Sequence, residues 1–285
     1  MKPSGKSVST AASGMEPSTR ARAMRLRDGA MSPEHVEIAA EVPVALVYNS
    51  ISHVVMMATP LDLADFGLGF SLSDRIIEEP GEMQAVEIIA DARGYQVAMR
   101  IPPARSFALR GRRRNITGLT GCGLCGVETL DQVHLSLPSI AGGPTVDVAA
   151  IHGALAALPA LQPLNRATGA IHAAAWSNLV GGIVIAREDV GRHNALDKLI
   201  GAMTRLKIDP ADGFAVITSR CSFEMAQKAV AARIRVLVAI SAPTSLALAV
   251  AERTGLTLVA LARTDSVTVY ANPERLSGTG LGAAP

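Results

Sequence analysis

The residues best suited to chemistry in this 285-residue chain lie in one glycine-rich stretch near its middle. Residues 120–126 read Thr-Gly-Cys-Gly-Leu-Cys-Gly, so Cys122 and Cys125 form a Cys-x-x-Cys pair. Glycine leaves backbone and sulfur open to approach because it has no Cβ. Nearby positive charge favours the thiolate, the nucleophilic form of cysteine, and six arginines come shortly before the pair: Arg100, Arg105, Arg110, Arg112, Arg113 and Arg114. The pattern therefore indicates sulfur chemistry.

Three other interpretations of the cysteine pair stay open. The pair could supply half of a structural zinc site, but such a site needs four ligands, and the one other cysteine in the sequence is Cys221. A thioredoxin-like dithiol normally opens a helix, for which the glycines around Cys125 are poor residues. The two could also be ordinary buried cysteines, although the glycine-rich setting argues against that.

The composition indicates a helix-and-sheet protein without a global charge field. Apolar residues make up 49% of the chain but aromatic residues only 3%, so Ala, Val, Leu and Ile must build the core, which suits helices packed on a buried sheet. The net charge of +2 gives no overall attraction to nucleic acid or membrane. Three cysteines do not resemble a secreted disulfide framework, so we expect a cytoplasmic protein.

The two chain ends are predicted to be tails around a structured body. Residues 1–36 have low hydrophobicity and scattered arginines, which indicates a disordered tail, and residues 273–285 end in a glycine-rich run that we expect to be flexible. Residues 20–27 contain four arginines. This run fits either a solvated tail or a segment that binds an acidic partner.

Residues 37–145 are expected to form an N-terminal α+β region that ends in the cysteine stretch. One helix begins at Thr59-Pro60, because proline suits the first helical position. Strands are expected at residues 44–47, 54–57, 86–90 and 95–101, the last two joined as a hairpin.

Residues 146–272 are expected to form an α/β domain that binds a cofactor. Strands that alternate with helices at this spacing predict βαβ units and a largely parallel sheet. We expect helices at residues 146–158, 170–178, 194–205, 224–233 and 245–253. We expect strands at residues 182–186, 214–218, 236–240, 256–261 and 267–270.

Polar residues follow these strands at the points where the strands end. Ligands of such sheets bind beyond the carboxyl ends of the strands, next to helix N-termini. The pattern predicts a concave rim for an anionic, phosphate-bearing ligand, although the same side chains can be helix caps, His172 a core histidine and Cys221 a small buried residue. The rim segments are residues 187–194, 219–222, 241–245 and 263–265.

Four segments together resemble the FdhD family, the formate dehydrogenase accessory sulfurtransferases. The resemblance covers about residues 41–272, with the segments in the same order along the chain as in the family. The segments are Cys122 to Gly126, Arg187 to Lys198, Glu224 to Ala229 and Ser241 to Ser245.

The resemblance implies a cytidine-deaminase-like α/β fold, with a mixed or parallel sheet flanked by helices. It implies that Cys122 takes sulfur from a cysteine desulfurase as a persulfide, with Cys125 assisting. The acceptor would be the molybdenum cofactor of formate dehydrogenase, Mo-bis(molybdopterin guanine dinucleotide). The resemblance also leads us to expect a homodimer that serves the catalytic subunit of formate dehydrogenase. The family's cofactor-binding segment falls on Leu261, Ala262, Arg263, Thr264, Asp265 and Ser266.

The chain departs from the family's pattern in two places. Thr120-Gly121 stand where serines often precede the first cysteine, and Thr264 and Ser266 stand where a glycine and a final basic residue are more usual. A non-catalytic chaperone that binds and carries the molybdenum cofactor is the alternative function. A zinc deaminase is a further rival, because residues 35–37 match the first half of its signature, but Gly121 stands where proline is required.

Overall fold

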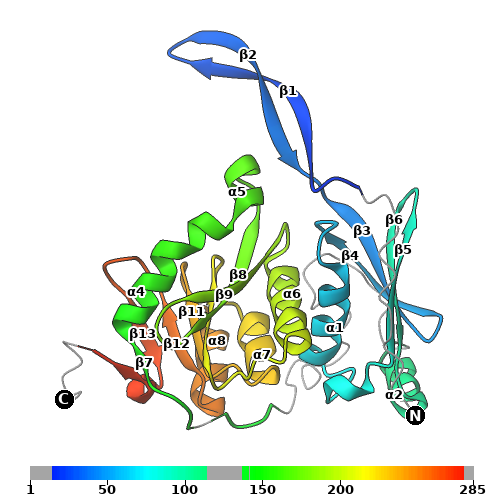
Figure 1. Cartoon of the computed structure of the whole chain (residues 1–285), viewed down its shortest axis with the longest axis vertical. Coiled ribbons are helices and arrows are strands. Elements are labelled where there is room, and N and C mark those ends of the chain that lie inside the picture. The colour runs from blue at the N-terminus through cyan, green and yellow to red at the C-terminus, as the bar shows by residue number, and fades with distance from the viewer. Residues whose placement is uncertain (1–14, 114–136, 141, 279–285) are drawn as a thin grey trace, which may run out of the picture.

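The computed structural model describes residues 15–113, 137–140 and 142–278, and Cys122 and Cys125 lie outside these ranges. The described chain forms two packed lobes and a projecting hairpin (Figure 1). Among the described residues, no helix combines the length and the apolar character needed to cross a bilayer.

The N-terminal lobe is a four-stranded sheet with α1 packed on one face. The strand order is β4-β3-β6-β5, and buried residues such as Val44, Leu46 and Val97 alternate along the strands and meet Phe66 of α1 in one core. This period-2 alternation is typical of a sheet with one face on a core. The elements are β3 (Val42–Tyr48), β4 (Ile51–Ala58), α1 (Leu63–Ser73), η1 (Pro80–Glu82), β5 (Ala85–Asp91), β6 (Gly94–Arg100) and α2 (Pro103–Arg113).

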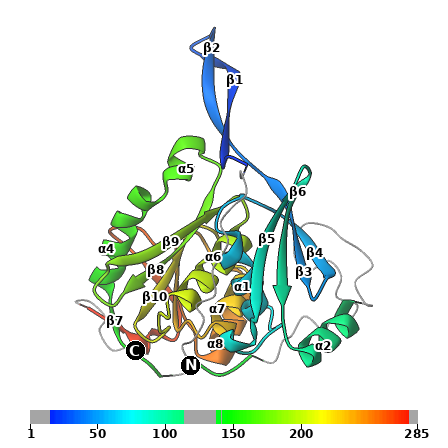
Figure 2. The same ribbon diagram turned by 45° about the vertical axis from the view of Figure 1, so that its right-hand side comes forward.

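The C-terminal lobe has three layers, with a six-stranded sheet between two layers of helices (Figure 2). The strand order in the sheet is β13-β12-β11-β10-β8-β9. Helices α6, α7 and α8 cover one face of the sheet, and α4 covers the other. The strands are β8 (His172–Asn178), β9 (Ile183–Asp189), β10 (Gly213–Ile217), β11 (Val236–Ala239), β12 (Thr257–Ala260) and β13 (Thr268–Ala271). The helices are α4 (Val148–Ala157), η2 (Leu158–Leu161), α5 (Pro163–Thr168), α6 (Arg192–Arg205), α7 (Phe223–Ala231) and α8 (Ser245–Thr254).

The sheet confirms the mixed α/β class, but the expectation of a largely parallel sheet is wrong. Only the β10–β11 and β11–β12 pairs are parallel. The β8–β10, β8–β9 and β12–β13 pairs are antiparallel.

The helix predicted at residues 170–178 is instead the inner strand β8. Its three alanines favour a helix by intrinsic propensity, but that preference is weak and tertiary packing overrides it. Ala173, Ala174 and Ala175 are almost fully buried between helices on the two faces of the sheet. Small side chains suit this strand because helices cover it on both sides.

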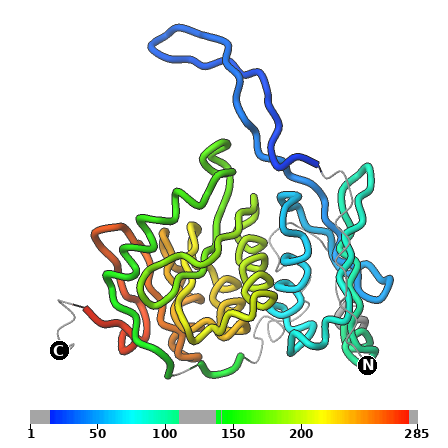
Figure 3. Tube along the Cα trace, viewed as in Figure 1, coloured from blue at the N-terminus to red at the C-terminus, as the bar shows by residue number. Residues whose placement is uncertain are grey.

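Part of the predicted N-terminal tail is an ordered hairpin. Strands β1 (Ser18–Arg27) and β2 (Ala30–Ala39) pair antiparallel over their whole length. Asp28 and Gly29 make the turn with φ of 51° and 80°, as a two-residue hairpin turn requires. We call residues 18–39 the arm. It projects from the two lobes, with α5 beside β2 (Figures 1 and 3). Because residues 18–39 are paired as strands, the prediction of disorder is wrong from Ser18 onward.

The predicted C-terminal tail is also ordered up to Ser277. After η3 (Pro273–Arg275), strand β14 (Leu276–Ser277) pairs with β7 (Val146–Asp147), which precedes α4. Arg275 is only 4% exposed, and its guanidinium donates to the carbonyl oxygens of Ile140, Gly142 and Gly255. The side chain therefore connects two backbone segments that are far apart in the sequence, around Ile140 and around Gly255.

The two lobes meet where α1 crosses α6 at two glycines. A Cβ on Gly69 would overlap the carbonyl oxygen of Asp197, and a Cβ on Gly201 would overlap that of Asp65. The helices can approach this closely only because neither position carries a side chain.

We expect Gly201→Ala to lower the free energy of unfolding by roughly 1 to 3 kcal/mol, because the added methyl group must push α1 and α6 apart. Urea denaturation measures this loss. Gly153→Ala on α4 is the matched control, because Gly153 is exposed with open space around its Cβ position. The control should be neutral or stabilising by up to about 1 kcal/mol. Equal effects of the two substitutions would contradict the close-packing account.

Candidate functional site

The candidate site is the edge of the six-stranded sheet where four strands end together. Strands β10, β11 and β12 are parallel, and β9 runs the same way because both β9 and β10 are antiparallel to β8. The helices α6, α7 and α8 begin just after these ends. Helix N-termini present free N–H groups and a partial positive charge, so this edge favours an anionic ligand.

Backbone hydrogen bonds join the loops after β10, β11 and β12 into one continuous rim. Leu261 N donates to Ser241 O at 3.2 Å, Cys221 N donates to Ala242 O at 3.2 Å, and Thr244 N donates to Cys221 O at 3.0 Å. The predicted rim segments 219–222, 241–245 and 263–265 therefore do lie at one edge of the sheet. These segments are far apart in the sequence but adjacent in the structure.

Three buried polar atoms near this rim have no hydrogen-bond partner among the described residues. They are Nε of Arg192 and Nε2 of His193, both in the first turn of α6, and Oγ of Ser222, the N-cap residue of α7. Buried polar atoms are nearly always satisfied in folded proteins. A guanidinium and a hydroxyl at two helix N-termini are suited to contact a phosphate or a carbonyl group of a ligand.

The histidines at the rim are neutral near pH 7. Burial, and then the charge of Arg192, lowers the pKa of His193 to about 4. The same two causes lower the pKa of His172, whose Nδ1 lies 3.5 Å from the hydroxyl of Thr218. His193 Nε2 is 3.9 Å from a carboxylate oxygen of Glu224, which is too long for a hydrogen bond. A neutral imidazole at this place can direct one donor or one acceptor at a ligand.

The predicted cofactor-binding segment, residues 261–266, directly follows β12 on the same rim. All of its residues are exposed except Ala262, which is 1% exposed and belongs to the core beneath α4. Arg263 donates from Nη1 to the carbonyl oxygen of Ile240 at 2.5 Å, and its backbone N donates to Ser266 O at 2.7 Å. The segment is thus a tight exposed turn whose arginine is held against the end of β11.

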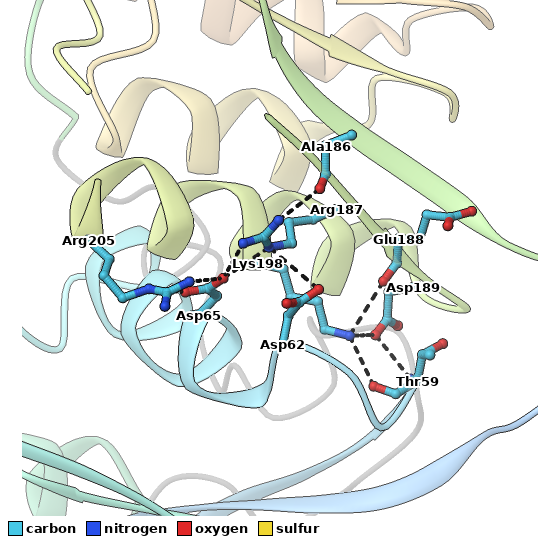
Figure 4. A network of polar contacts seen from close by, with 9 residues as sticks. All are labelled: Thr59, Asp62, Asp65, Ala186, Arg187, Glu188, Asp189, Lys198 and Arg205. Carbon is cyan, nitrogen blue, oxygen red and sulfur yellow. Dashed lines mark hydrogen bonds and ion pairs between the residues drawn. The ribbon is translucent and has the colours of Figure 1, made fainter. Parts of the chain in front are cut away.

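Two residues in the first half of the predicted rim segment 187–194, Arg187 and Asp189, contact the N-terminal lobe (Figure 4). Lys198 Nζ lies 2.6 Å from Asp189 Oδ2, with both side chains fully buried. Lys198 also donates to Thr59 O at 3.0 Å, and Thr59 N donates to Asp189 Oδ2 at 3.0 Å. This pair therefore attaches the N-terminal lobe to the sheet domain, and the expectation that Asp189 belongs to a ligand rim is wrong.

Arg187 is a second tie between the lobes and not a rim residue. It donates to a carboxylate oxygen of Asp65 on α1 from Nε at 2.9 Å and from Nη2 at 2.8 Å. Arg205 of α6 binds the same carboxylate from the other side, with Nε 2.9 Å from Oδ1 of Asp65. Figure 4 shows Asp65 between the two guanidinium groups.

A third tie involves Lys228 of α7. Its Nζ lies 2.7 Å from Asp74 Oδ1 and 3.0 Å from Asp197 Oδ2, and Ser73 Oγ donates to Asp197 Oδ1 at 2.6 Å. Burial would lower the pKa of Lys228, but Asp197 and Asp74 outweigh it and raise the pKa above its usual value. The lysine is therefore held as a cation where α1, α6 and α7 meet.

The sequence does contain a signal for these ties, in the spacing of α1. Asp65, Gly69 and Ser73 recur every four residues, so they lie on one stripe of the helix, and all three are buried. A polar stripe with a central glycine indicates close contact with a second polar helix.

The remaining predicted residues have clear positions or lie outside the described ranges. Cys221 is fully buried, and burial raises the pKa of its thiol to about 12, so it is a packing residue rather than a reactive thiol. His35 and Glu37 lie on the arm, on the exposed strand β2, away from the rim. Cys122 and Cys125 stay predictions, because the structure does not describe residues 114–136.

The sequence matches one protein family over most of its length. A model described as the FdhD/NarQ family matches residues 39–277, which include both cysteines of the pair, the rim and all three ties. The chain belongs to the FdhD/NarQ family. The resemblance drawn from its motifs is confirmed, and the arm lies almost entirely before the matched region.

Named relatives of this FdhD/NarQ chain are bacterial. A protein of Xanthomonas euvesicatoria pv. vesicatoria (strain 85-10), called sulfur carrier protein FdhD, is 49% identical over 252 residues, covering 88% of this chain and 90% of that protein. A protein of the same name from Bordetella petrii is 45% identical over 258 residues, covering 90% and 93%.

A solved structure shows the same fold. It is described as a putative formate dehydrogenase accessory protein from Desulfotalea psychrophila, and it superposes with a TM-score of 0.73. The alignment covers 92% of this chain and 100% of the other at 24% identity. At this identity the likeness concerns the fold alone.

We expect Lys198→Met to lower the free energy of unfolding by roughly 3 to 5 kcal/mol, because it leaves the Asp189 carboxylate buried without its cation. Urea denaturation at neutral pH measures the loss. Glu34→Gln is the control, since its ion pair with Arg25 is solvent-exposed and such pairs contribute less than about 1 kcal/mol. A loss for Lys198→Met as small as that of the control would show that the pair does not hold the lobes together.

Proposed function

We propose that this FdhD/NarQ chain is a sulfur carrier that accepts sulfur on Cys122 and delivers it to the molybdenum cofactor of formate dehydrogenase. The observation that carries the proposal is the family match, which runs through the cysteine pair and whose curated members are called sulfur carriers. The donor is a cysteine desulfurase, and the acceptor is Mo-bis(molybdopterin guanine dinucleotide), bound as a substrate. The homodimer and the catalytic subunit of formate dehydrogenase as client follow from the same resemblance.

The sulfur transfer has two balanced steps. In the first, the Cys122 thiolate attacks the outer sulfur of the desulfurase persulfide, a new S–S bond forms, and the desulfurase cysteine leaves as a thiolate. In the second, the Cys125 thiolate attacks the inner sulfur of the Cys122 persulfide. The outer sulfur leaves as hydrosulfide for the molybdenum, where it replaces an oxygen ligand that departs as water or hydroxide. The resulting disulfide is then reduced by a cellular thiol.

The rim supports the binding half of the proposal. A guanine dinucleotide carries pyrophosphate groups and a base with polar edges. The N-termini of α6, α7 and α8, together with the unpartnered atoms of Arg192 and Ser222, offer donors for such groups. The exposed turn 261–266 adds Arg263 and three further polar side chains at the same edge. These residues fit a phosphate-bearing ligand.

Sulfur loading tests the catalytic half. After incubation with a purified cysteine desulfurase and cysteine, we expect the protein to gain the mass of one sulfur atom on the peptide that contains Cys122 and Cys125. Cys122→Ala should abolish the gain, whereas Cys221→Ala should retain it, because that thiol is buried with a raised pKa. Full loading of a folded Cys122→Ala variant would refute the assignment. Cofactor binding by wild type without any sulfur gain would favour the non-catalytic carrier instead.

Ligand titration tests the binding half. Guanosine diphosphate is the probe, because it contains the guanine and pyrophosphate of the cofactor. We expect Arg192→Gln and Ser222→Ala each to weaken its binding by about 10-fold or more, since each removes a hydrogen bond to a charged group. The controls are Arg253→Gln, in the last turn of α8 at the opposite edge of the sheet, and Ser52→Ala on β4. Unchanged affinity in both rim variants would place the ligand elsewhere.

A further inference from the structure

The arm takes no part in either core of the molecule. No residue between Met15 and Glu41 is among the buried residues, and none packs against the three apolar clusters. The arm also lies before the region that the family model matches, apart from the last residue of β2. Its twenty-two residues are ordered as a hairpin outside the three apolar clusters. A surface role explains such an element better than a stabilising one.

Strand β1 offers a long backbone edge for a third strand. The arm is a two-stranded sheet among the described residues, and α5 lies beside β2, not β1. Every second residue of an edge strand directs its N–H and C=O groups away from its partner, which makes such an edge a template for pairing with another chain. β1 is ten residues long, so alternation leaves five of its residues of this kind.

The charge of β1 selects the kind of strand that can pair with it. β1 carries Arg20, Arg22, Arg25 and Arg27 and no acidic residue. Arg20 stands opposite Glu37 of β2. Arg25 stands opposite Ser32 and forms a diagonal ion pair with Glu34, with Nε 2.6 Å from Oε2. Arg22 and Arg27 stand opposite His35 and Ala30, so no acidic residue faces them across the hairpin. A second copy of β1 would set four arginines against four others, and like charges across strands are destabilising.

The outer half of the arm is apolar on one face. Leu26 of β1 stands opposite Met31 of β2, and Met24 is two residues along the same face. Their exposed fractions are 69%, 66% and 53%. Arg20 and Arg22 continue this face toward the body of the protein. A strand that complements this face would therefore carry acidic side chains near the body of the protein and apolar side chains near the tip of the arm.

We propose that β1 binds an acidic, extended segment of a partner protein, which adds to the arm as a third strand. Backbone hydrogen bonds supply the pairing, as in other cases of strand addition, and the arginines select an acidic sequence. The choice of probes below rests on the proposed function, which names the cysteine desulfurase and the catalytic subunit of formate dehydrogenase as partners.

The experiment measures the dissociation constant of each of these two purified proteins with the full chain at low and moderate salt. The test variant is Arg22→Glu/Arg27→Glu, which leaves the Arg25–Glu34 ion pair of the arm in place. The matched control is Arg93→Glu/Arg253→Glu, with the same total charge change. Both arginines are exposed, Arg93 in the β5–β6 turn, where it pairs with Asp91, and Arg253 in the last turn of α8. We expect the test variant to weaken one of the two complexes at least about tenfold and to flatten its salt dependence, while the control changes little.

Hydrogen exchange in the complex tests strand addition directly. We expect amides of residues 18–27 to become protected when the partner binds to wild type. Loss of affinity without this protection would overturn the strand model, and so would equal effects of the two double variants or no binding of either protein. Stronger arm-dependent binding of a short DNA duplex, or loss of a homodimer in the test variant, would replace the proposed occupant with nucleic acid or a second copy.

The sulfur-loading assay separates failure of this proposal from failure of the proposed function. If wild type gains no sulfur but binds a partner through the arm, the sulfur-carrier function fails and the arm proposal stands. If wild type loads normally and the arm variant binds and loads as well as its control, the arm proposal fails alone.

Discussion

The buried ion pair of Lys198 and Asp189 is the interaction on which the arrangement of the two lobes depends. Both side chains are fully buried, and each also bonds to the backbone of Thr59, at the start of the segment that leads into α1. Removing two charges from water is costly, so such a pair persists only with close geometry and further hydrogen bonds. Because both side chains also bond to the backbone of Thr59, the full set of contacts forms in only one position of the N-terminal lobe.

The other ties and the glycine crossing act on the same contact between α1 and α6. The carboxylate of Asp65 lies between two arginines, and Lys228 is held by Asp74 and Asp197. Helix α6 begins at the rim. Because contacts along its length hold α6 against α1, they also fix the positions of its first residues, Arg192 and His193, in the candidate site. Arg187, Asp189 and Lys198 thus position Arg192 and His193 and do not line the candidate site themselves.

Most elements were predictable from the sequence, and the errors have separate physical causes. The strands of the N-terminal lobe and the helices α4, α6, α7 and α8 lie close to their predicted positions, because local patterns decide them. Helix α1 begins at Leu63, three residues after the predicted Thr59-Pro60 start. Strand β8 was mistaken for a helix since alanine propensity is weaker than burial between two layers. The composition of residues 1–36 is typical of a tail, but Asp28-Gly29 is typical of a hairpin turn and predicts the arm. The roles of Arg187 and Lys198 depend on Asp65 of α1 and on the backbone of Thr59, both far away in the sequence.

The contacts of Arg275 with two distant backbone segments have a consequence for how the protein is made. The domain from β7 onward cannot complete its pairing until β14 and Arg275 have left the ribosome, since their partners include the carbonyls of Ile140 and Gly142 and strand β7. The N-terminal lobe has all four of its strands much earlier in synthesis. Chains interrupted shortly before residue 275 would therefore emerge with a finished first lobe and an open second one, exposed to chaperones and proteases.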